Sequence, residues 1–327
     1  MTQVHLLNPF RDAHGGSEQR TLALYELLRP HAEVTLWSSE PPLAGDALPY
    51  TVEVIDPERG QVPNGGNLVI VGSYFAAELV FPWLRPRRVI YIYNTPGPRN
   101  FARRLRLVRE LMGIEPEIVY AAPEGAQGIG LPGRFEASPI DLERFHPARR
   151  AAGSRDAGRF TIGRVSRDVP EKHHPDDVAL YRAALSHGWS LRLMGATCLA
   201  ATMEPALYRQ MEVLPCGALP VEDFLAGLDC FYYRVSDDWN EAFGRVVLEA
   251  MAAGLPVVCD AKVGAARLIE QGASGIVTES TEQTMAALRR LADDSVLRHR
   301  MGAAARRRAE ATYSPDQVAE MIAFYTR

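Results

Sequence analysis

The sequence predicts an α/β fold with two domains, each built on a parallel sheet. The chain has 327 residues, which is enough for two domains of ordinary size. Its 47% hydrophobic and 23% charged residues are typical of a globular protein. Short apolar runs alternate with segments of helical apolar spacing, a pattern that indicates βαβ units.

The first half of the chain contains one such alternating set. Two segments, Thr21–Leu28 and Phe101–Met112, have the apolar spacing of helices. The predicted strands are Val4–Leu7, Val34–Trp37, Val52–Ile55, Leu68–Val71, Val89–Tyr93 and Ile118–Tyr120. We therefore expect a largely parallel sheet in this half.

A second set follows an interruption at Ser138–Pro147. A polar stretch rich in Ala, Arg and Gly then runs to about Gly158 and predicts an interdomain linker. The predicted strands are Phe160–Val165, Leu191–Met194, Val213–Pro215, Cys230–Tyr233, Val257–Cys259 and Gly275–Val277. The predicted helices are Val178–Leu185, Val221–Ala226, Phe243–Ala253 and Thr284–Leu291. Near the end, Ser314 is the expected N-cap of a last helix and Pro315 its first residue.

Composition excludes several classes of protein. The net charge of -4 provides no general attraction to nucleic acid. No run of about 18 apolar residues is present, so we expect no membrane span. The four cysteines have no metal-like spacing and no targeting segment is evident, so we expect free thiols in the cytoplasm. Only two of the 36 basic residues are lysines, Lys172 and Lys262, which draws attention to both.

The most informative segment contains two carboxylates, Glu241 and Glu249, around an expected helix start. Phe243 and Gly244 would open this helix, so their backbone N–H groups and the helix dipole favour an anion there. The carboxylates of Glu241 and Glu249, two turns apart, can each accept hydrogen bonds from hydroxyl groups of a ligand. The alternative is an amphipathic helix with two solvated acids.

The segment Glu241-Ala-Phe-Gly-Arg-Val-Val-Leu-Glu249 resembles the Glu-x7-Glu motif of retaining glycosyltransferases of family 4, which have the GT-B fold. The resemblance implies two facing Rossmann-like domains, at residues 1–147 and 148–312, with a central cleft. It also implies that the helix at 313–327 returns to the first domain. The donor would be a nucleoside-diphosphate sugar, with no cofactor and no metal. We therefore expect Asp237 and Asp238 to shape the loop before Glu241.

A basic loop after the first strand of the second domain is the expected site of the donor diphosphate. The family has Gly-Arg and then a Lys about five or six residues on; here Gly163-Arg164 and Lys172 are further apart. Arg167 has the tighter spacing, so either Arg164 or Arg167 pairs with Lys172. The alternative is a solvated loop with unrelated charges. We expect His173 and His174 to be surface residues.

Other donor and acceptor residues follow from the same resemblance. Gly15 and Gly16 follow the first strand, where the family has a Gly-Gly-x-Glu segment facing donor diphosphate and acceptor; a tight turn is the alternative. His14 could contact phosphate or acceptor, and a plain turn residue is the alternative. Asn94 stands where many relatives have a sugar-binding His. Gly195 is expected at the base pocket.

Between Arg85 and Arg109 the sequence has eight arginines and no acid. Phe101, Leu105 and Val108 recur on one helix face, with most arginines elsewhere around it. Such a helix suits an anionic membrane surface, so we expect peripheral contact with the inner leaflet. The alternatives are a core-facing helix with a solvated basic face and a site for an anionic acceptor.

The sequence thus predicts a metal-independent retaining glycosyltransferase. Arg164, Lys172 and Glu241 would be its catalytic residues, and the partners would be a nucleotide sugar and a glycan, lipid-linked or small-molecule acceptor. The base, the sugar, the acceptor and the oligomeric state stay open. Two alternatives remain, a nucleotide-sugar epimerase of similar fold and a non-catalytic module that binds nucleotide sugars.

Overall fold

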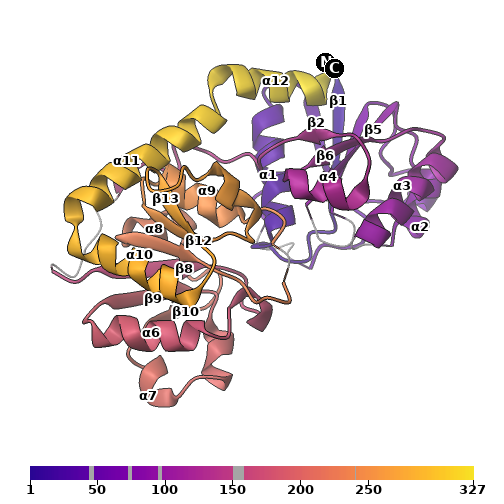
Figure 1. The fold of residues 1–327 in the computed structure, drawn as a ribbon. Coiled ribbons are helices and arrows are strands. Elements are labelled where there is room, and N and C mark those ends of the chain that lie inside the picture. The colour runs from indigo at the N-terminus through magenta and orange to yellow at the C-terminus, as the bar shows by residue number, and fades with distance from the viewer. Residues whose placement is uncertain (44–47, 73–75, 95–97, 150–157, 240) are drawn as a thin grey trace. The chain divides into compact units, whose positions relative to one another are not determined.

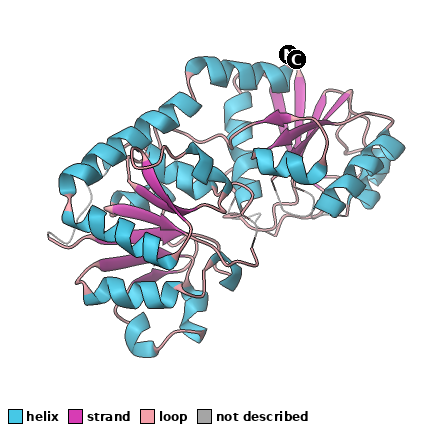
Figure 2. Ribbon diagram, viewed as in Figure 1, coloured by secondary structure: helices cyan, strands magenta, loops and turns pink. Residues whose placement is uncertain are grey.

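The computed structural model describes residues 1–43, 48–72, 76–94, 98–149, 158–239 and 241–327 (Figure 1). The chain forms two compact units. Unit 1 contains residues 1–139 and 313–327, and unit 2 contains residues 140–312. Each unit is a parallel sheet with helices, as Figure 2 shows by secondary structure. The two-domain α/β prediction is confirmed.

Unit 1 has a seven-stranded parallel sheet in the order β3-β2-β1-β4-β5-β6-β7. Its strands are β1 (Gln3–Leu7), β2 (Glu33–Ser38), β3 (Glu53–Val54), β4 (Asn67–Val71), β5 (Arg88–Tyr93), β6 (Glu117–Tyr120) and β7 (Arg134–Phe135). Its helices are α1 (Gly16–Leu28), α2 (Ala77–Val80), α3 (Pro98–Met112), α4 (Pro123–Ile129) and α12 (Pro315–Thr326), with short 3-10 turns η2 (Pro57–Arg59) and η3 (Phe81–Trp83).

The apolar face of α3 packs into the core of unit 1. Phe101, Leu105 and Val108 are fully buried, and the Phe101 ring lies edge-on to Tyr91 at 5.1 Å between ring centroids. Burying such a side chain stabilises the fold by about 1.5–3 kcal/mol. This face is therefore unavailable to a membrane, and of the interpretations of this helix the structure supports the core-facing one.

Helix α12 completes unit 1 through a buried polar cluster. The Ser314 side chain accepts a hydrogen bond from the backbone of Gln317 and Pro315 begins the helix, as the sequence predicts. The Tyr325 hydroxyl donates to Glu136 at 2.7 Å, and the same carboxylate pairs with Arg20 at 3.2 Å. Glu136, which follows strand β7, and Arg20 of helix α1 thus hold the end of α12.

Unit 2 has a six-stranded parallel sheet in the order β10-β9-β8-β11-β12-β13. Its strands are β8 (Thr161–Val165), β9 (Ser190–Met194), β10 (Glu212–Leu214), β11 (Cys230–Tyr233), β12 (Val257–Asp260) and β13 (Gly275–Thr278). Its helices are α6 (Asp177–Ser186), α7 (Pro205–Tyr208), α8 (Val221–Ala226), α9 (Arg245–Ala252), α10 (Thr281–Asp293) and α11 (Ser295–Thr312), with 3-10 turns η4 (Pro170–Lys172), η5 (Thr197–Ala201) and η6 (Gly264–Leu268).

The first unit ends at Pro139, earlier than the expected boundary at residue 147. The reason is that the following segment packs on unit 2. Arg306 of α11 donates to the backbone carbonyls of Leu142 and Phe145, and Arg144 pairs with Glu222 at 2.9 Å. Most of the linker expected near Gly158, residues 150–157, lies outside the described residues. Across the described chain, no helix is both long and apolar enough to cross a membrane.

Candidate functional site

The candidate site of unit 2 lies at the carboxyl ends of its two central strands. β8 and β11 are neighbours, and the connections from them continue to opposite sides of the sheet, because β9 lies beyond β8 and β12 beyond β11. Ligands of open α/β sheets bind at such a switch point. The loop after β8 contains Arg167 and Lys172, and the loop after β11 contains Glu241. The fold thus brings together residues 69 positions apart.

Lys172 and Glu241 form a largely buried ion pair. The ammonium group contacts Oε2 of Glu241, and the Tyr233 hydroxyl donates to the same oxygen at 2.9 Å. Burial lowers the pKa of Lys172, and Glu241 only partly offsets this effect. Burial also raises the pKa of Tyr233, so its hydroxyl keeps its proton. The centre therefore contains a cation that gains from any additional negative charge.

Arg164 is fully buried, and its guanidinium group is engaged inside unit 2. Its NH1 pairs with Oδ2 of Asp177 at 3.1 Å, and its NH2 donates to the backbone carbonyl of Lys172. The Tyr232 hydroxyl donates to Asp177 at 2.6 Å. This arrangement corrects the expectation that Arg164 contacts the diphosphate, since its guanidinium group instead anchors the loop that contains Lys172.

Arg167, unlike Arg164, is only half-buried, and it lies beside an aromatic ring. Its guanidinium carbon lies 5.5 Å from the centroid of the Trp239 ring, and the Lys172 ammonium lies 4.9 Å from the same centroid. Within the described residues, no carboxylate pairs with the Arg167 guanidinium. Its N–H donors thus stay available, so Arg167 is the better of the two candidate partners for Lys172.

Helix α9 begins at Arg245, two residues later than the sequence predicts. Gly244 is its N-cap, with φ of 78°, and a Cβ atom there would come within 2.6 Å of Val263. Phe243 is buried, and its carbonyl accepts a bond from the Ala265 N–H at 2.6 Å. Gly244 has no side chain to cap the helix, so the positive end of the helix dipole lies beside Glu241.

Glu249 lies inside the second turn of α9 and is buried. Arg245, one turn earlier, donates from Nε to Oε1 of Glu249 at 2.7 Å. This pair holds the carboxylate in one orientation. A diol that binds Glu249 would replace or share the bond from Arg245.

Gly195 follows β9 and packs against the loop after β8. Its φ is 76°, and a Cβ atom would collide with the carbonyl oxygen of Ser166. The Gly195 carbonyl accepts from the Ser166 hydroxyl and contacts Nε2 of His173, both at 3.1 Å. Packing alone thus explains this glycine. His173 and His174 are buried and not at the surface as expected, and burial lowers the pKa of His173 to about 3.

The predicted residues of unit 1 follow β1 and β5. Gly15 is the N-cap of α1, and a Cβ atom there would collide with the Glu18 carboxylate. Gly16 has an ordinary φ and open space beside it, so no contact within unit 1 requires a glycine. His14 is exposed, and Asn94 is half-buried directly after β5.

Acidic residues from outside the arginine-rich segment pair with several of its arginines. Glu78 pairs with both Arg103 and Arg104, at 2.9 Å for Arg104. Arg109 pairs with Glu115 at 2.5 Å, although no acid lies within the segment itself. Arg85, Arg87, Arg99 and Arg106 remain exposed.

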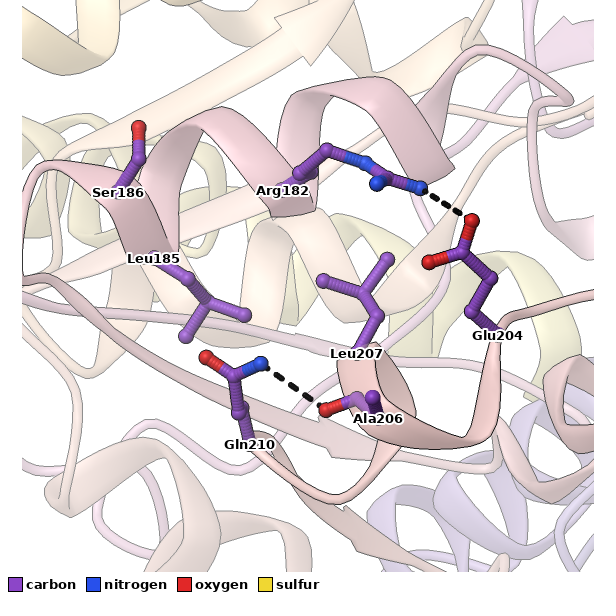
Figure 3. A pocket seen from close by; sticks show the side chains of 7 residues that line it. All are labelled: Arg182, Leu185, Ser186, Glu204, Ala206, Leu207 and Gln210. Carbon is purple, nitrogen blue, oxygen red and sulfur yellow. Dashed lines mark hydrogen bonds and ion pairs between the residues drawn. The ribbon is translucent and has the colours of Figure 1, made fainter.

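A separate pocket of unit 2 lies between α6 and α7 (Figure 3). Its lining residues are Arg182, Leu185, Ser186, Glu204, Ala206, Leu207 and Gln210. Arg182 and Glu204, the two charged residues among them, pair with each other at 3.3 Å. None of the seven belongs to the predicted site. Elsewhere in the described ranges, no group of three or more His, Cys, Asp or Glu is placed to hold a metal ion.

Sequence reasoning missed three members of the site, Tyr233, Trp239 and Asp177. Tyr233 ends an apolar strand, where a parallel sheet presents its binding residues, and this position was a usable signal. Trp239 lies beside the acids that we expected only to shape the loop. Asp177 lies at the first position of α6, and nothing in its local sequence indicates its contact with Arg164.

Residues 210–308 match the family model of glycosyl transferases group 1. The D-inositol 3-phosphate glycosyltransferase of Geodermatophilus obscurus is 29% identical over 255 residues, 69% of this chain and 51% of that protein. Spore coat protein SA of Bacillus subtilis is 36% identical over 90 residues, 27% of this chain and 24% of that protein. The chain spans about half the length of the first of these relatives and a quarter of the second.

Solved structures resemble the whole chain. HepE of Anabaena in complex with UDP-glucose has a TM-score of 0.74 at 15% identity, with 99% of both chains covered. Sucrose-phosphate synthase of Thermosynechococcus elongatus has a TM-score of 0.73 at 14% identity, covering 99% of this chain and 98% of that one. The chain therefore has the GT-B fold of glycosyltransferases, and its second unit contains a region similar to glycosyl transferases group 1.

Proposed function

We propose that this protein is a retaining glycosyltransferase of family 4, which moves a sugar from a nucleoside-diphosphate sugar to a hydroxyl of a glycan, lipid-linked or small-molecule acceptor. One observation supports this most directly. The buried Lys172–Glu241 pair lies at the switch point of unit 2, beside the uncapped start of α9. A cation, a helix end and a sugar-binding acid are what a sugar diphosphate requires.

Each group has a distinct role in this proposal. Lys172 and Arg167 bind the diphosphate, with the first N–H groups of α9 beside it. Glu241 accepts hydrogen bonds from the donor sugar, and Glu249 accepts them from the ribose. Gly16 of unit 1 has open space beside it, and its contact with donor or acceptor stays a prediction.

The Lys172–Glu241 pair makes the cation available when the donor arrives. The diphosphate competes with Glu241 for the ammonium group, and the freed carboxylate turns to the sugar hydroxyls. As the bond between the anomeric carbon and the leaving oxygen breaks, negative charge grows on the departing phosphate. Lys172 and Arg167 stabilise that charge. The acceptor oxygen bonds to the same face of the anomeric carbon, and its proton passes to the departing phosphate.

UDP-glucose is the first donor to test, because the structure of HepE was solved with it. Inositol 3-phosphate belongs among the acceptors, because the relative from Geodermatophilus is named for it. Release of the nucleoside diphosphate and the anomeric configuration of the product measure the reaction. We expect acceptor-dependent release, an unchanged anomeric configuration and full activity in excess chelator.

Other outcomes separate the alternatives. Conversion of a donor to another sugar nucleotide without acceptor would establish an epimerase. Donor binding with neither transfer nor slow hydrolysis would establish a binding module. Loss of activity in chelator, restored by magnesium or manganese, would contradict the metal-independent mechanism.

We also propose that unit 1 contacts an anionic membrane surface from the cytoplasmic side, through a surface that differs from the apolar face of α3. Leu79 and Trp83 are 72% and 53% exposed on α2 and η3, which pack beside α3. Exposed arginines, including Arg99 and Arg106, lie on α3 itself. An exposed Trp with nearby arginines suits the boundary between lipid headgroups and acyl chains.

A further inference from the structure

Trp239 lies in the loop between β11 and α9, just before the first glutamate of the Glu-x7-Glu motif. Its backbone N–H donates to the Ser236 carbonyl at 3.0 Å, which fixes the turn. Its half-buried ring is close to both cations of the candidate site, at 4.9 Å for Lys172 and 5.5 Å for Arg167. One aromatic ring is thus shared by two positive side chains.

Holding two cations at one ring requires a compensating attraction. Lys172 and Arg167 repel each other. Burial is the main cause of the lowered pKa of Lys172, Glu241 opposes it, and the positive charge of Arg167 lowers the pKa further. Glu241 pairs with Lys172, and within the described chain no acid pairs with Arg167. The electron-rich face of an indole attracts cations more strongly than any other side-chain ring. The Trp239 ring can therefore hold Arg167 where no carboxylate does.

A hydrogen bond from the indole N–H does not explain the position of the Trp239 ring. Nε1 of Trp239 is buried and makes no hydrogen bond with the described residues. A buried donor without an acceptor is unfavourable, and a phenylalanine would avoid this cost. Contact of the ring with the two cations is a favourable term that offsets it.

We propose that Trp239 is a positioning residue that holds Lys172 and Arg167 at one aromatic ring, so that the two cations bind the diphosphate as a unit. The inference rests on the proposed function for the identity of the ligand. It adds a residue outside the Glu-x7-Glu motif and the basic loop. The ring acts through the two side chains and does not touch the reacting atoms.

Inorganic pyrophosphate is the probe that tests this proposal, because it requires no base pocket and no sugar. Calorimetry on the full chain compares Trp239→Leu with Trp239→Phe, which keeps an aromatic face but lacks the N–H. Trp189→Leu is the matched control, because it removes the same atoms from unit 2 at a ring that contacts Phe160 and His187.

We expect Trp239→Leu to weaken pyrophosphate binding about tenfold, as the loss of two cation contacts implies. Trp239→Phe should stay within about threefold of the wild type, and Trp189→Leu should bind as the wild type does. The alkaline loss of binding should also move to lower pH in Trp239→Leu, because the ring favours the protonated form of Lys172. A residue with a purely structural role would leave this pH unchanged.

Three results would overturn the proposal: equal affinities of wild type and Trp239→Leu, an equal loss in Trp239→Phe and Trp239→Leu, or no pyrophosphate binding by the wild type. The sugar-transfer assay is independent of these results. If transfer fails while the variants separate as expected, the proposed function is wrong and the pair of cations stands. If transfer succeeds and the variants do not separate, only the role of Trp239 is wrong.

Discussion

Lys172 is a cation whose charge depends on its surroundings. The side chain is 9% exposed, and burial lowers its pKa below the ordinary 10.5. The ammonium form is therefore lost at a lower pH than for a lysine in water, and it is regained when a diphosphate adds negative charge. If Lys172 binds the donor as proposed, we expect the same residue to set the upper pH limit of donor binding.

We predict that Lys172→Ala lowers turnover more than donor affinity, because the charge that Lys172 stabilises grows in the transition state. A loss of at least 100-fold in kcat, about 2.7 kcal/mol, would match the removal of one such group. In the wild type, kcat/KM should fall as pH rises through the lowered pKa of Lys172. Lys172→Arg, which does not titrate in this range, should move that fall to higher pH; full activity of Lys172→Ala would exclude the role.

At the residue scale, sequence reasoning predicted the meeting of Lys172 and Glu241 better than the orientation of Arg164. Lys172 and Glu241 follow adjacent parallel strands, so their meeting follows from the strand assignment. The orientation of Arg164 does not, because it depends on Asp177 and Tyr232, which come from different elements. Which arginine faces a ligand is a property of packing in three dimensions.

The start of α9 is the element on which the site depends most. Gly244 takes a left-handed conformation, and this places the first N–H groups of the helix after Glu241 and Phe243. Close contact with Val263 leaves no room for a side chain. The turn thus has both a backbone and a steric reason for glycine.

We predict that Gly244→Ala destabilises unit 2 by about 1–2 kcal/mol from the left-handed conformation alone, with more from the contact with Val263. The thermal midpoint should fall and donor binding should weaken. Gly16→Ala is the matched control for stability, since its φ is ordinary and its surroundings are open; its midpoint should not fall. An unchanged midpoint in Gly244→Ala would contradict the strain.

Apolar spacing predicted most elements, and two of those it missed, α11 and β7, were missed for different reasons. Helix α11 (Ser295–Thr312) is rich in Ala and Arg, and after Leu297 and Met301 its buried face is formed by small residues, Gly302, Ala305 and Ala309. Hydrophobic spacing cannot detect such a face, because alanine contributes little to the pattern. Strand β7 has only two residues, which is too short for an apolar pattern, and it is defined by its pairing with β6.

At the scale of the whole molecule, the exposed apolar side chains of unit 1 give the membrane proposal a test. We predict that the protein sediments with anionic vesicles at low salt, less at high salt and not with neutral vesicles. Trp83→Ser combined with Arg106→Ser should abolish sedimentation and leave nucleotide binding unchanged. Arg103→Ser is the control, because Arg103 is already paired with Glu78 and should have little effect. Sedimentation that does not depend on lipid charge would refute the proposal.

The cluster of Arg20, Glu136 and Tyr325 joins both ends of unit 1, which leads us to expect an order of folding for the two units. Unit 2 is one continuous segment, whereas unit 1 needs residues 313–327 to complete its buried polar cluster, because the Tyr325 hydroxyl donates to Glu136. During synthesis, the first domain usually folds first. Here unit 2 can complete its core before α12 is available to residues 1–139. We therefore expect unit 1 to complete its folding after unit 2.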